Sequence, residues 1–423
     1  MIKLCSVEND LATIELKLDI SGSMLDVEER IQSALNEAGV VLTQETLKRF
    51  DTDGSPILTG PIKWTSKGQV EKVFQTPYGE ATVARHVYQT SEGGKTFCPL
   101  DRDARIVTSS TPRFAKMVSF KVANNATTVV QRDLDENHGR KVSREFVHQI
   151  TEAVGAIAQI KEESWEYETP KMARPISSVA VGIDGTCMFL SKDGWREAMT
   201  GTVSLYDEDG ERQHTIYIGG APEYGKATFH KRMEHEIAHV KSLYPKATWV
   251  GLADGAQSNW TFLASHTSMQ ILDFWHVTQY LEAFAKAVYP NSDTDRHQWL
   301  DQHRHDLKHN SGAASRILAD MEELAKRTFP AAAKEQVDGA ITYFRNHWHQ
   351  MNYHFYQCKG LPIGSGVTEA ACKTLVKHRL CASGMRWKEH GAGIVLSLRA
   401  LVLTRDRWGQ FWSKVNRFGF SPA

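Results

Sequence analysis

Two aspartates occur in apolar stretches of this 423-residue chain, where a carboxylate needs an explanation. Asp184 lies within "SVAVGIDGTCMFLS", and Asp254 ends "ATWVGLADG". Aspartate is disfavoured in strands and costly to bury without a partner. An Asp-Gly turn explains Asp254 well but Asp184 poorly, because the strand pattern continues through "TCMFL". Converging carboxylates repel one another unless a cation holds them, and hard oxygen ligands suit Mg²⁺ or Mn²⁺.

A third carboxylate, Glu369, begins a basic stretch in "GLPIGSGVTEAACKTLVKHRL". One interpretation is local: Ser365 or Gly366 caps a helix, and a glutamate in the first turn complements the helix dipole. At about 100° per residue, Glu369, Lys373 and Lys377 share one broad face. A Glu–Lys pair four residues apart stabilises a helix by roughly 0.2–0.5 kcal/mol without any ligand. If Glu369 holds a metal instead, both lysines are available for phosphates.

The stretch "HEIAH" (235–239) matches the H-E-x-x-H signature, in which two histidines one helical turn apart bind zinc and the glutamate acts as base. In a helical projection, both histidines lie roughly 120–160° from the centre of the apolar stripe. We therefore predict that they lie on a solvated face. The metzincin extension is missing, because Ser242 and Pro245 replace the glycine and the third histidine. A zinc metalloprotease is a remote alternative.

The distribution of charge says more than its total. The chain has 50 basic and 50 acidic residues, so its formal net charge is zero. From Ala370 onwards, ten Lys or Arg residues face two acids, Glu389 and Asp406, and the net charge of +8 favours a phosphate-bearing partner. The six cysteines form no CxxC pattern, which argues against a zinc ribbon and favours a reducing compartment. Without a secretory pattern or a long apolar stretch, we expect a cytosolic protein.

The elements that must position these residues fall into several segments. Residues 1–108 read as a mixed α/β region, with helices near 24–38 and 43–50 and two strands around the turn "PYG". The polar, proline-bounded segment 164–177 reads as a linker. From Ser178 the pattern is strand, strand, strand, helix, strand, helix, strand, which predicts a mixed sheet with helices packed on it. Such sheets display functional carboxylates where strands end.

Residues 109–163 predict three helices in quick succession. Ser143 caps the third helix after a short turn, which is the layout of a helix-turn-helix domain whose second helix enters the major groove of DNA. Arg140, Lys141 and Arg144 cluster at the start of that helix, and we predict that they bind DNA. A plain three-helix bundle is the alternative interpretation.

Several stretches, in order along the chain, together indicate a family. They are "VGIDGT", "GLADGAQSNW", "ILDFWHVTQYL", "GLPIGSGVTEAACKTLVKHRL", "SGMRWKEHGAGIVLSLRAL" and "DRWGQFW". On these stretches the chain resembles the RNase H-like transposases with an Asp, Asp, Glu triad, and among them the Mutator-related, ISKra-type group of bacterial insertion sequences. The resemblance covers about residues 178–415. It implies an α/β fold with an RNase H-like mixed sheet formed by 178–276 and 358–423, and a helical insertion at 277–357 before the glutamate.

The resemblance implies that Asp184, Asp254 and Glu369 form the catalytic triad and hold two Mg²⁺ (or Mn²⁺) ions. It also places Asp273 and His276 of "DFWH", the counterpart of an Asp-x-x-His box, beside the site. Two such cations activate the attacking oxygen and stabilise the leaving oxygen during in-line displacement at phosphorus. The implied activity is DNA transposition: cleavage at the transposon ends, then joining of the 3′-OH to new DNA.

The resemblance also implies the partners. Transposon ends and target are double-stranded DNA, bound by a homodimer or higher oligomer at the nucleoid in the bacterial cytoplasm, with no membrane. We expect phosphate contacts from the basic C-terminal part. The expected contacts are Lys373, Lys377, Arg379 and Arg386. Trp299 is expected to stack on an unpaired base, as a tryptophan does in related transposases, although core packing is the commoner role of such a residue.

Two further classes of protein stay open at this point. A metal-dependent DNA nuclease would keep the triad without strand transfer, and a domesticated DNA-binding protein would keep the fold without activity. Relatives often carry paired cysteines in the sheet of the N-terminal region. Because this chain has only Cys98 in the predicted N-terminal sheet, we carry over no zinc site from the resemblance.

Overall fold

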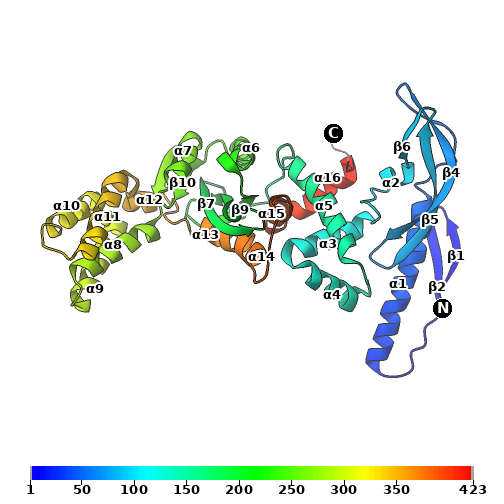
Figure 1. The fold of residues 1–423 in the computed structure, drawn as a ribbon, viewed down its shortest axis with the longest axis horizontal. Helices are drawn as coiled ribbons and strands as arrows, with labels where there is room; N and C mark the ends of the chain where they lie inside the picture. Colours follow the sequence, from blue (N-terminus) through cyan, green and yellow to red (C-terminus); the bar gives the residue numbers. More distant parts are fainter. Residues whose placement is uncertain (1, 421–423) are drawn as a thin grey trace. The chain divides into compact units, whose positions relative to one another are not determined.

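The computed structural model describes residues 2–420 (Figure 1). The chain forms a mixed α/β structure and divides into two compact units. Within the described residues, unit 1 comprises 2–162, 397–402 and 407–420, and unit 2 comprises 163–396 and 403–406. Unit 1 is therefore assembled from three separate stretches of the chain.

Unit 1 begins with a hairpin and a small sheet. Strands β1 (Ile2–Glu8) and β2 (Leu11–Leu16) pair antiparallel. A second antiparallel sheet has the strand order β3-β4-β5-β6. Its strands are β3 (Ile57–Thr59), β4 (Ile62–Gln75), β5 (Glu80–Thr90) and β6 (Gly93–Phe97). Strands β4 and β5 flank the "PYG" turn, which confirms the hairpin predicted there.

Helix α1 (Met24–Lys48) is one continuous helix, so the prediction of separate helices near 24–38 and 43–50 is wrong. Its start is a capping box, in which Ser23 and Asp26 satisfy each other's backbone N–H groups. Gly39 lies in its middle because the Tyr78 ring packs there: an added Cβ would come within 2.3 Å of Tyr78 Cγ. Packing of Tyr78 against Gly39 therefore stabilises a continuous helix where the sequence pattern predicted a break.

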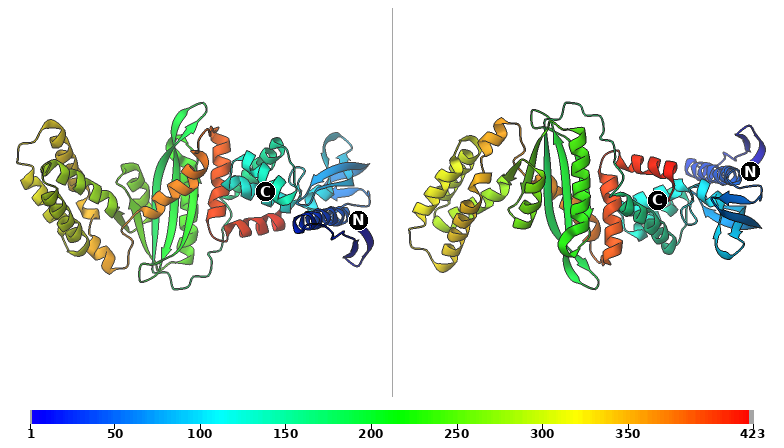
Figure 2. Two further views of the ribbon diagram at one scale, coloured as in Figure 1. Left: turned by 90° about the horizontal axis from the view of Figure 1, so that it is seen from below. Right: turned by 90° about the horizontal axis from the view of Figure 1, so that it is seen from above.

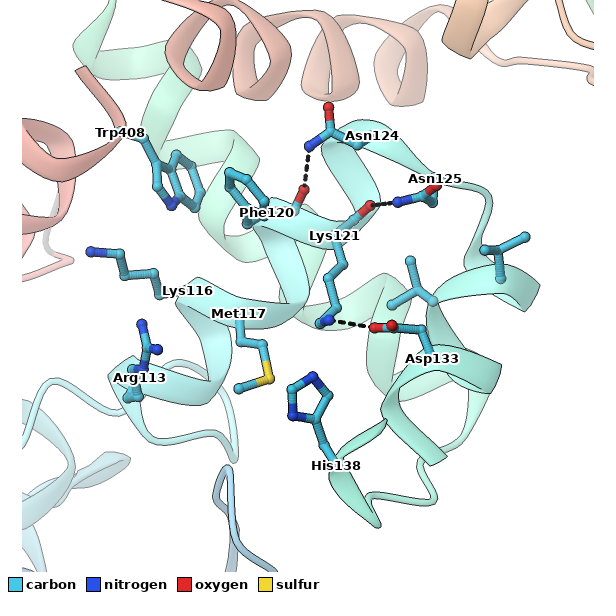
Figure 3. Close-up of a pocket in the computed structure, with 12 residues that line it drawn as sticks. Arg113, Lys116, Met117, Phe120, Lys121, Asn124, Asn125, Asp133, His138 and Trp408 are labelled. Carbon is cyan, nitrogen blue, oxygen red and sulfur yellow. Dashed lines mark hydrogen bonds and ion pairs between the residues drawn. The ribbon is translucent and has the colours of Figure 1, made fainter. Parts of the chain in front are cut away.

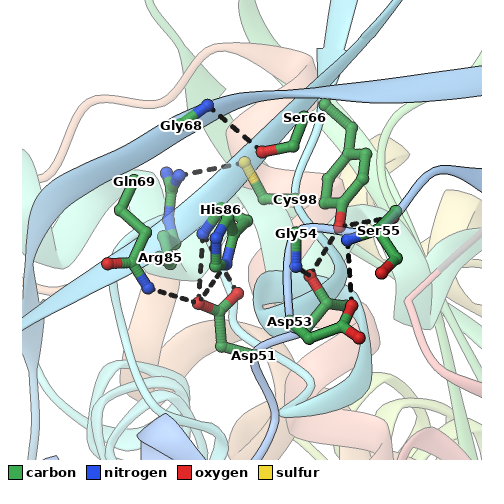
Figure 4. Close-up of polar contacts among 12 residues, drawn as sticks. Asp51, Asp53, Gly54, Ser55, Ser66, Gly68, Gln69, Arg85, His86 and Cys98 are labelled. Carbon is green, nitrogen blue, oxygen red and sulfur yellow. Dashed lines mark hydrogen bonds and ion pairs between the residues drawn. The ribbon is translucent and has the colours of Figure 1, made fainter.

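A polar network joins the end of α1 to β5 (Figure 4). Asp51 accepts hydrogen bonds from the backbone N–H of His86 at 3.0 and 3.2 Å, and its carboxylate lies 2.9 Å from His86 Nδ1. Nearby, the guanidinium of Arg85 donates to the sulfur of Cys98 at 2.9 Å. These contacts hold the loop after α1 against the sheet.

The next part of unit 1 is helical, and it confirms the three helices predicted between residues 109 and 163. After the short helix α2 (Pro99–Asp103) come α3 (Pro112–Asn124), α4 (Thr127–His138) and α5 (Arg144–Lys161). Gly139, with φ of 60°, ends α4 in the left-handed region. Ser143 caps α5 by accepting from the N–H of Phe146 at 3.0 Å. The buried faces of α3 and α5 meet where Phe114 stacks on Phe146.

The C-terminal helices return to unit 1. Residues 397–402 of α15 (Glu389–Leu403) and all of α16 (Arg407–Phe418) belong to it. The guanidinium of Arg399 donates to the carbonyl oxygen of Ala123 at 2.6 Å, at the end of α3. Burial lowers the pKa of Arg399 to about 10. The helical part of unit 1 is therefore completed by residues far along the chain.

Unit 2 is built on a five-stranded mixed sheet of order β11-β10-β7-β8-β9. Strands β7 (Ser178–Leu190), β8 (Gly194–Tyr206) and β9 (Arg212–Gly220) are antiparallel. Strands β10 (Thr248–Ala253) and β11 (Met269–Leu272) continue the sheet in parallel from β7. Helix α6 (Ala227–Leu243) precedes β10, and α7 (Gln257–His266) follows it. This order of strands and helices is the one predicted from the sequence.

Helices cover both faces of this sheet (Figure 2). A Cβ on Gly201 of β8 would lie 2.2 Å from the sulfur of Met233, so α6 packs closely on one face. Thr202, the next residue, points to the other face and contacts Thr368 of α13 (Gly366–Ala371) at 2.7 Å between the hydroxyl oxygens. Successive residues of one strand thus contact different layers.

A helical segment separates β11 from α13. Its helices are α8 (Phe274–Val288), α9 (Asp293–His309), α10 (Ala313–Leu324), α11 (Ala331–His347) and α12 (Tyr353–Cys358). A short 3₁₀ turn, Trp348–Gln350, lies between α11 and α12, and another, Tyr224–Lys226, precedes α6. After α13, residues Cys372–Lys377 form a π-helical turn that leads into α14 (His378–Leu380). The chain thus returns to the sheet immediately before Glu369.

Candidate functional site

Asp184 and Asp254 lie at the same edge of the parallel strand pair. In the register of β10 and β7, Leu252 pairs with Gly182. Continuing that register by two residues sets Asp254 opposite Asp184, and neighbouring strands are about 4.8 Å apart. Both aspartates are half-buried, and Asp254 is the first residue after β10 ends. The sheet therefore presents two carboxylates side by side on one face.

Helix α13 approaches that same face because Gly182 has no side chain. An added Cβ on Gly182 would lie 2.1 Å from Thr368 Oγ1, closer than any contact allows. Gly182 and Asp184 are two residues apart on β7, so their side-chain positions share one face. Glu369, the residue after Thr368, is exposed, and its Oε1 accepts a hydrogen bond from the Ser365 hydroxyl at 2.8 Å.

Cys372 connects the π-helical turn to Asp184. Its thiol donates to Asp184 Oδ2 at 3.3 Å. Burial, together with the negative charge of Asp184, raises the pKa of Cys372 to about 12, so the thiol keeps its proton. A π turn is commonly found at functional positions in helices. Here it begins three residues after Glu369 and brings a hydrogen-bond donor against the central aspartate.

Asp184 feels the charges of both other carboxylates. Burial raises the pKa of Asp184, and the negative charges of Asp254 and Glu369 raise it further. The Cys372 thiol and the backbone N–H of Gly185 oppose this shift by donating to the carboxylate. In the part of the chain that the structure describes, no group of three His, Cys, Asp or Glu side chains is already arranged as a metal-binding set. The three carboxylates thus interact through their charges without forming a ready coordination shell.

Asp273 and His276 support this region from the end of β11. Asp273 is buried, caps α8 by accepting from the N–H of His276, and also accepts from the backbone N–H of Ser365. Asp273 therefore ties the strand end to the loop before Glu369. The His276 ring lies between aromatic neighbours, 5.6 Å from the Tyr280 ring and 6.2 Å from the Tyr343 ring.

Tyr343 and Asn259 hold the backbone around the two aspartates. The Tyr343 hydroxyl donates to the carbonyl oxygen of Asp254 at 3.0 Å, and Asn259 Nδ2 donates to the carbonyl oxygen of Ile183 at 3.3 Å. No sequence pattern marked these two residues, or Cys372, because each acts through a contact with a residue far along the chain. Gly182 is the exception, since a glycine two residues before a strand aspartate is visible in "VGIDGT".

The basic residues after Glu369 have different environments. Lys373, Lys377 and Arg386 are exposed. Arg379 is 3% exposed and its guanidinium lies over the Trp387 ring at 5.0 Å, so the expected phosphate contact at Arg379 is wrong for this conformation. Counting 100° per residue is also wrong beyond Cys372, because a π turn bonds each residue to the fifth along.

Two other expected DNA contacts are buried. Arg140 is 6% exposed: it donates to Thr76 O at 2.9 Å and to Gln75 Oε1 at 2.7 Å, so it joins the helices of unit 1 to the sheet. Trp299 is 8% exposed, stacks on His303 at 4.0 Å, and donates to Asp320 Oδ2 at 2.9 Å. Both side chains serve packing here. Lys141 and Arg144 are exposed.

The "HEIAH" helix face is not solvated, so that prediction is also wrong. Glu236 is 8% exposed, and His239 is mostly buried with its Nε2 3.0 Å from the carbonyl oxygen of Tyr167. Tyr167 belongs to the segment 164–177, which covers this side of α6. A histidine ring engaged by backbone and a covering segment leave no open metal position at this motif.

Comparison with models of known protein families found no match to this chain, and comparison with curated proteins found none either. Among the helices of residues 2–420, none combines the length and the apolar character needed to cross a membrane.

Proposed function

We propose that this protein is a DNA transposase of the RNase H-like class with an Asp, Asp, Glu triad. The observation that carries the proposal is the meeting of Asp184, Asp254 and Glu369, which are separated in sequence, on one face of the unit 2 sheet. Asp184 interacts electrostatically with both of the others. Three neighbouring carboxylates destabilise the fold unless they bind a cation. Their arrangement therefore favours a functional site over a purely structural role.

The strand arrangement supports the RNase H-like assignment. Three antiparallel strands are followed by two parallel strands, in the order β11-β10-β7-β8-β9. The first aspartate is on the central strand, the second follows the adjacent parallel strand, and the glutamate is on a helix packed against the sheet. The resemblance noted in the sequence implies this order of elements.

The donor set fits Mg²⁺ or Mn²⁺. Carboxylate oxygens are the ligands that these ions prefer. Burial, and to a smaller extent the charges of Asp254 and Glu369, raise the pKa of Asp184, and a bound cation would favour its charged form. Asp184, Asp254 and Glu369 would together hold the ions. The ions would supply the activation of the attacking oxygen and the stabilisation of the leaving oxygen in phosphodiester hydrolysis and transesterification.

The surrounding residues have positioning roles in this proposal. The thiol of Cys372 orients the carboxylate of Asp184, and the Ser365 hydroxyl orients that of Glu369. Tyr343 fixes the backbone of Asp254, and Asp273 fixes the loop that precedes Glu369. Because Asp273 is buried and engaged by two backbone N–H groups, it acts as a positioning residue and not as a further ligand.

The proposed partners follow from the proposed activity. Double-stranded DNA from transposon ends and target would meet the exposed Lys373, Lys377 and Arg386, which would bind backbone phosphates. A homodimer or higher oligomer on DNA would bring two ends together. The proposed location is the bacterial cytoplasm, at the nucleoid.

The test is a cleavage and joining assay. Purified protein is incubated with candidate end DNA and Mg²⁺ or Mn²⁺, and the products are sequenced. We expect cleavage followed by joined products, and we expect Asp184→Asn or Glu369→Gln to abolish both while leaving DNA binding largely intact. Asp193→Asn, an exposed carboxylate in the turn after β7, is the matched control and should retain activity. Cleavage by a triad variant at the wild-type rate would refute the assignment.

The same assay separates the alternatives. Cleavage without joined products would indicate a metal-dependent DNA nuclease. If neither product formed, Mn²⁺ binding measured by electron paramagnetic resonance would decide between an inactive DNA-binding protein and an unsuitable DNA substrate. If the wild type binds Mn²⁺ and Asp184→Asn does not, the proposed metal site is supported. If the wild type does not bind Mn²⁺, the proposed metal site is refuted.

A further inference from the structure

A groove in unit 1 follows the outward face of α3 (Figure 3). Its floor carries Arg113, Lys116, Met117, Phe120, Lys121 and Asn124, spaced three and four residues apart, so they form one helix face. Helix α4 and Trp408 of α16 form its walls. The groove encloses about 600 Å³, a size suited to a small organic group or a short stretch of an extended chain.

Its charge is positive and only partly compensated. Among the charged side chains that line it, three bases (Arg113, Lys116, Lys121) stand against one acid (Asp133), a formal excess of two, since 3 − 1 = 2. Lys121 forms an ion pair with Asp133. Within the described residues, the side chains of Arg113 and Lys116 have neither a hydrogen bond nor an ion pair. The unneutralised charge therefore lies at the Arg113 end.

The positions of Arg113 and Lys116 are unfavourable for the stability of α3 itself. They occupy the first two turns of α3, where the helix dipole disfavours cations, and no acid is present in that first turn. Burial, and then the charge of Arg113, lower the pKa of Lys116. An anion at this end of the groove would relieve both effects.

An exposed aromatic surface lies beside the bases. Phe120 is 43% exposed, and its ring centroid is 5.9 Å from that of Trp408 with the planes tilted by 50°. Large exposed aromatic rings next to basic side chains without an ion-pair partner are typical of sites that bind single-stranded nucleic acid. In such sites the phosphates contact the basic side chains and the nucleobases stack on the aromatic rings. A concave groove of this size admits one strand, whereas a duplex about 20 Å wide presents a convex surface.

Helix α5, the expected recognition helix, is less suited to DNA. It has two bases, Arg144 and Lys161, and two acids, Glu145 and Glu152, so its formal charge is zero. Helix α3 has three bases and no acid. Arg140, which precedes α5, is buried against the sheet. Of these two helices, α3 therefore has the stronger electrostatic preference for phosphates.

From these observations we infer that the α3 groove binds a single strand of nucleic acid, with phosphates on Arg113 and Lys116 and a base stacked against Phe120. The inference rests on the proposed function only for the source of the strand, such as an unpaired segment at a cleaved transposon end. Its chemistry does not depend on cleavage.

The test measures binding to the full-length protein in EDTA, so that no metal-dependent reaction contributes. The probe is a fluorescein-labelled 20-nucleotide oligothymidylate followed by fluorescence anisotropy, with a 20-base-pair duplex of the same length for comparison. Phe120→Ala should weaken binding of the single strand by roughly 5- to 150-fold, the range expected for loss of one stacked base. Phe120→Leu, which keeps an apolar side chain at the contact with Trp408, should show a similar loss if stacking is responsible.

The bases are tested by the salt dependence of binding. Arg113→Ala with Lys116→Ala should reduce the slope of log K against log[salt] by about 1.4, since each phosphate contact on a single strand contributes about 0.7. Arg132→Ala, an exposed arginine on α4 outside the groove, is the matched control and should bind as the wild type does. Arg144→Ala on α5 tests the alternative contact on that helix.

Several outcomes would overturn the inference. One is that the groove variants bind the single strand with wild-type affinity and salt slope. Another is that Arg144→Ala loses more affinity than the groove variants do, which would assign the contact to α5. Tighter binding of a 20-residue polyglutamate than of the oligothymidylate would assign the groove to an acidic peptide. Failure of cleavage with groove binding intact would count against the proposed transposase alone, and the two failures are thus distinguishable.

Discussion

Asp184 combines partial burial with two neighbouring negative charges, and this determines how its removal should act. Its pKa is raised above the usual carboxyl value by burial, then by Asp254 and Glu369. A raised carboxyl pKa means that the folded state binds the proton more tightly than the unfolded state does. The stability linked to this proton is fully present below the unfolded pKa and is lost as the pH rises through the folded pKa.

We therefore predict that Asp184→Asn stabilises the metal-free protein at neutral pH. The melting temperature in EDTA should rise by about 2–4 °C for each kcal/mol gained, and the gain should shrink as the pH falls toward the ordinary carboxyl range. Mg²⁺ or Mn²⁺ should raise the melting temperature of the wild type and leave that of the variant almost unchanged. A variant that melts below the wild type in EDTA would show that the charged, half-buried Asp184 does not destabilise the metal-free protein.

Gly182 decides how closely α13 can approach the sheet. Gly182→Ala sets a methyl group 2.1 Å from Thr368 Oγ1, so we expect it to destabilise unit 2 by about 1–3 kcal/mol and to displace Glu369. Gly182→Ala combined with Thr368→Ala should recover much of the loss. Gly366→Ala, at the start of α13 with open space around it, is the control and should be close to neutral. Urea unfolding measures these differences.

At the scale of elements, α6 and α7 share a histidine pair that should make unit 2 sensitive to acid. His230 and His266 pack against the two sides of the Phe262 ring, at 4.8 and 4.5 Å between centroids. Burial lowers the pKa of each imidazole below 6.5, and for His266 the nearby Glu234 opposes this only in part. A lowered histidine pKa means that the unfolded state binds more protons, so stability falls as the pH drops below about 6.5.

We predict that the urea midpoint of the wild type, followed by tryptophan fluorescence, is lower at pH 5.0 than at pH 7.5. The double variant His230→Gln with His266→Gln should lose less stability over that interval. His297→Gln, an exposed histidine on α9, should behave as the wild type does. An equal acid sensitivity in the double variant would place its origin at other groups.

At the scale of the whole molecule, unit 1 is not a continuous piece of the chain. Its N-terminal 162 residues pack with 397–402 and with α16, whose Phe411, Trp412 and Val415 are buried. We predict that a fragment of residues 1–162 is unstable, because it exposes the surfaces that these residues cover. A chain truncated after Asp406 should lose thermal stability by several degrees relative to the full chain. Circular dichroism melting of the truncated and the full-length chain tests this, and equal melting temperatures would contradict it.

The same discontinuity affects how the proposed nucleic-acid binding by unit 1 can be tested. The α3 groove includes Trp408, and Arg399 is bonded to the end of α3. A fragment limited to residues 109–163 lacks both. Full-length protein with point substitutions is therefore the suitable material for binding experiments.

Local patterns in the sequence were sufficient for much of the fold. Period-two and period-3.6 patterns located the strands and helices of unit 2 in order, and a capping serine marked the start of α5, because these signals depend on neighbours along the chain. The strand context of Asp184 and Asp254 also singled them out as candidate site residues. Their role as metal ligands stays a prediction.

The tertiary structure decided which polar side chains are buried and what they contact. Arg140, Arg379 and Trp299 were expected to contact DNA, and a helical projection placed the "HEIAH" histidines on a solvated face. Each of these sites is instead covered by a segment distant in sequence or by an aromatic neighbour. Cys372, at the start of the π turn, reaches Asp184 across 188 residues of sequence. Long-range packing determines such contacts, and a pattern of neighbouring residues contains no information about the partner across the interior.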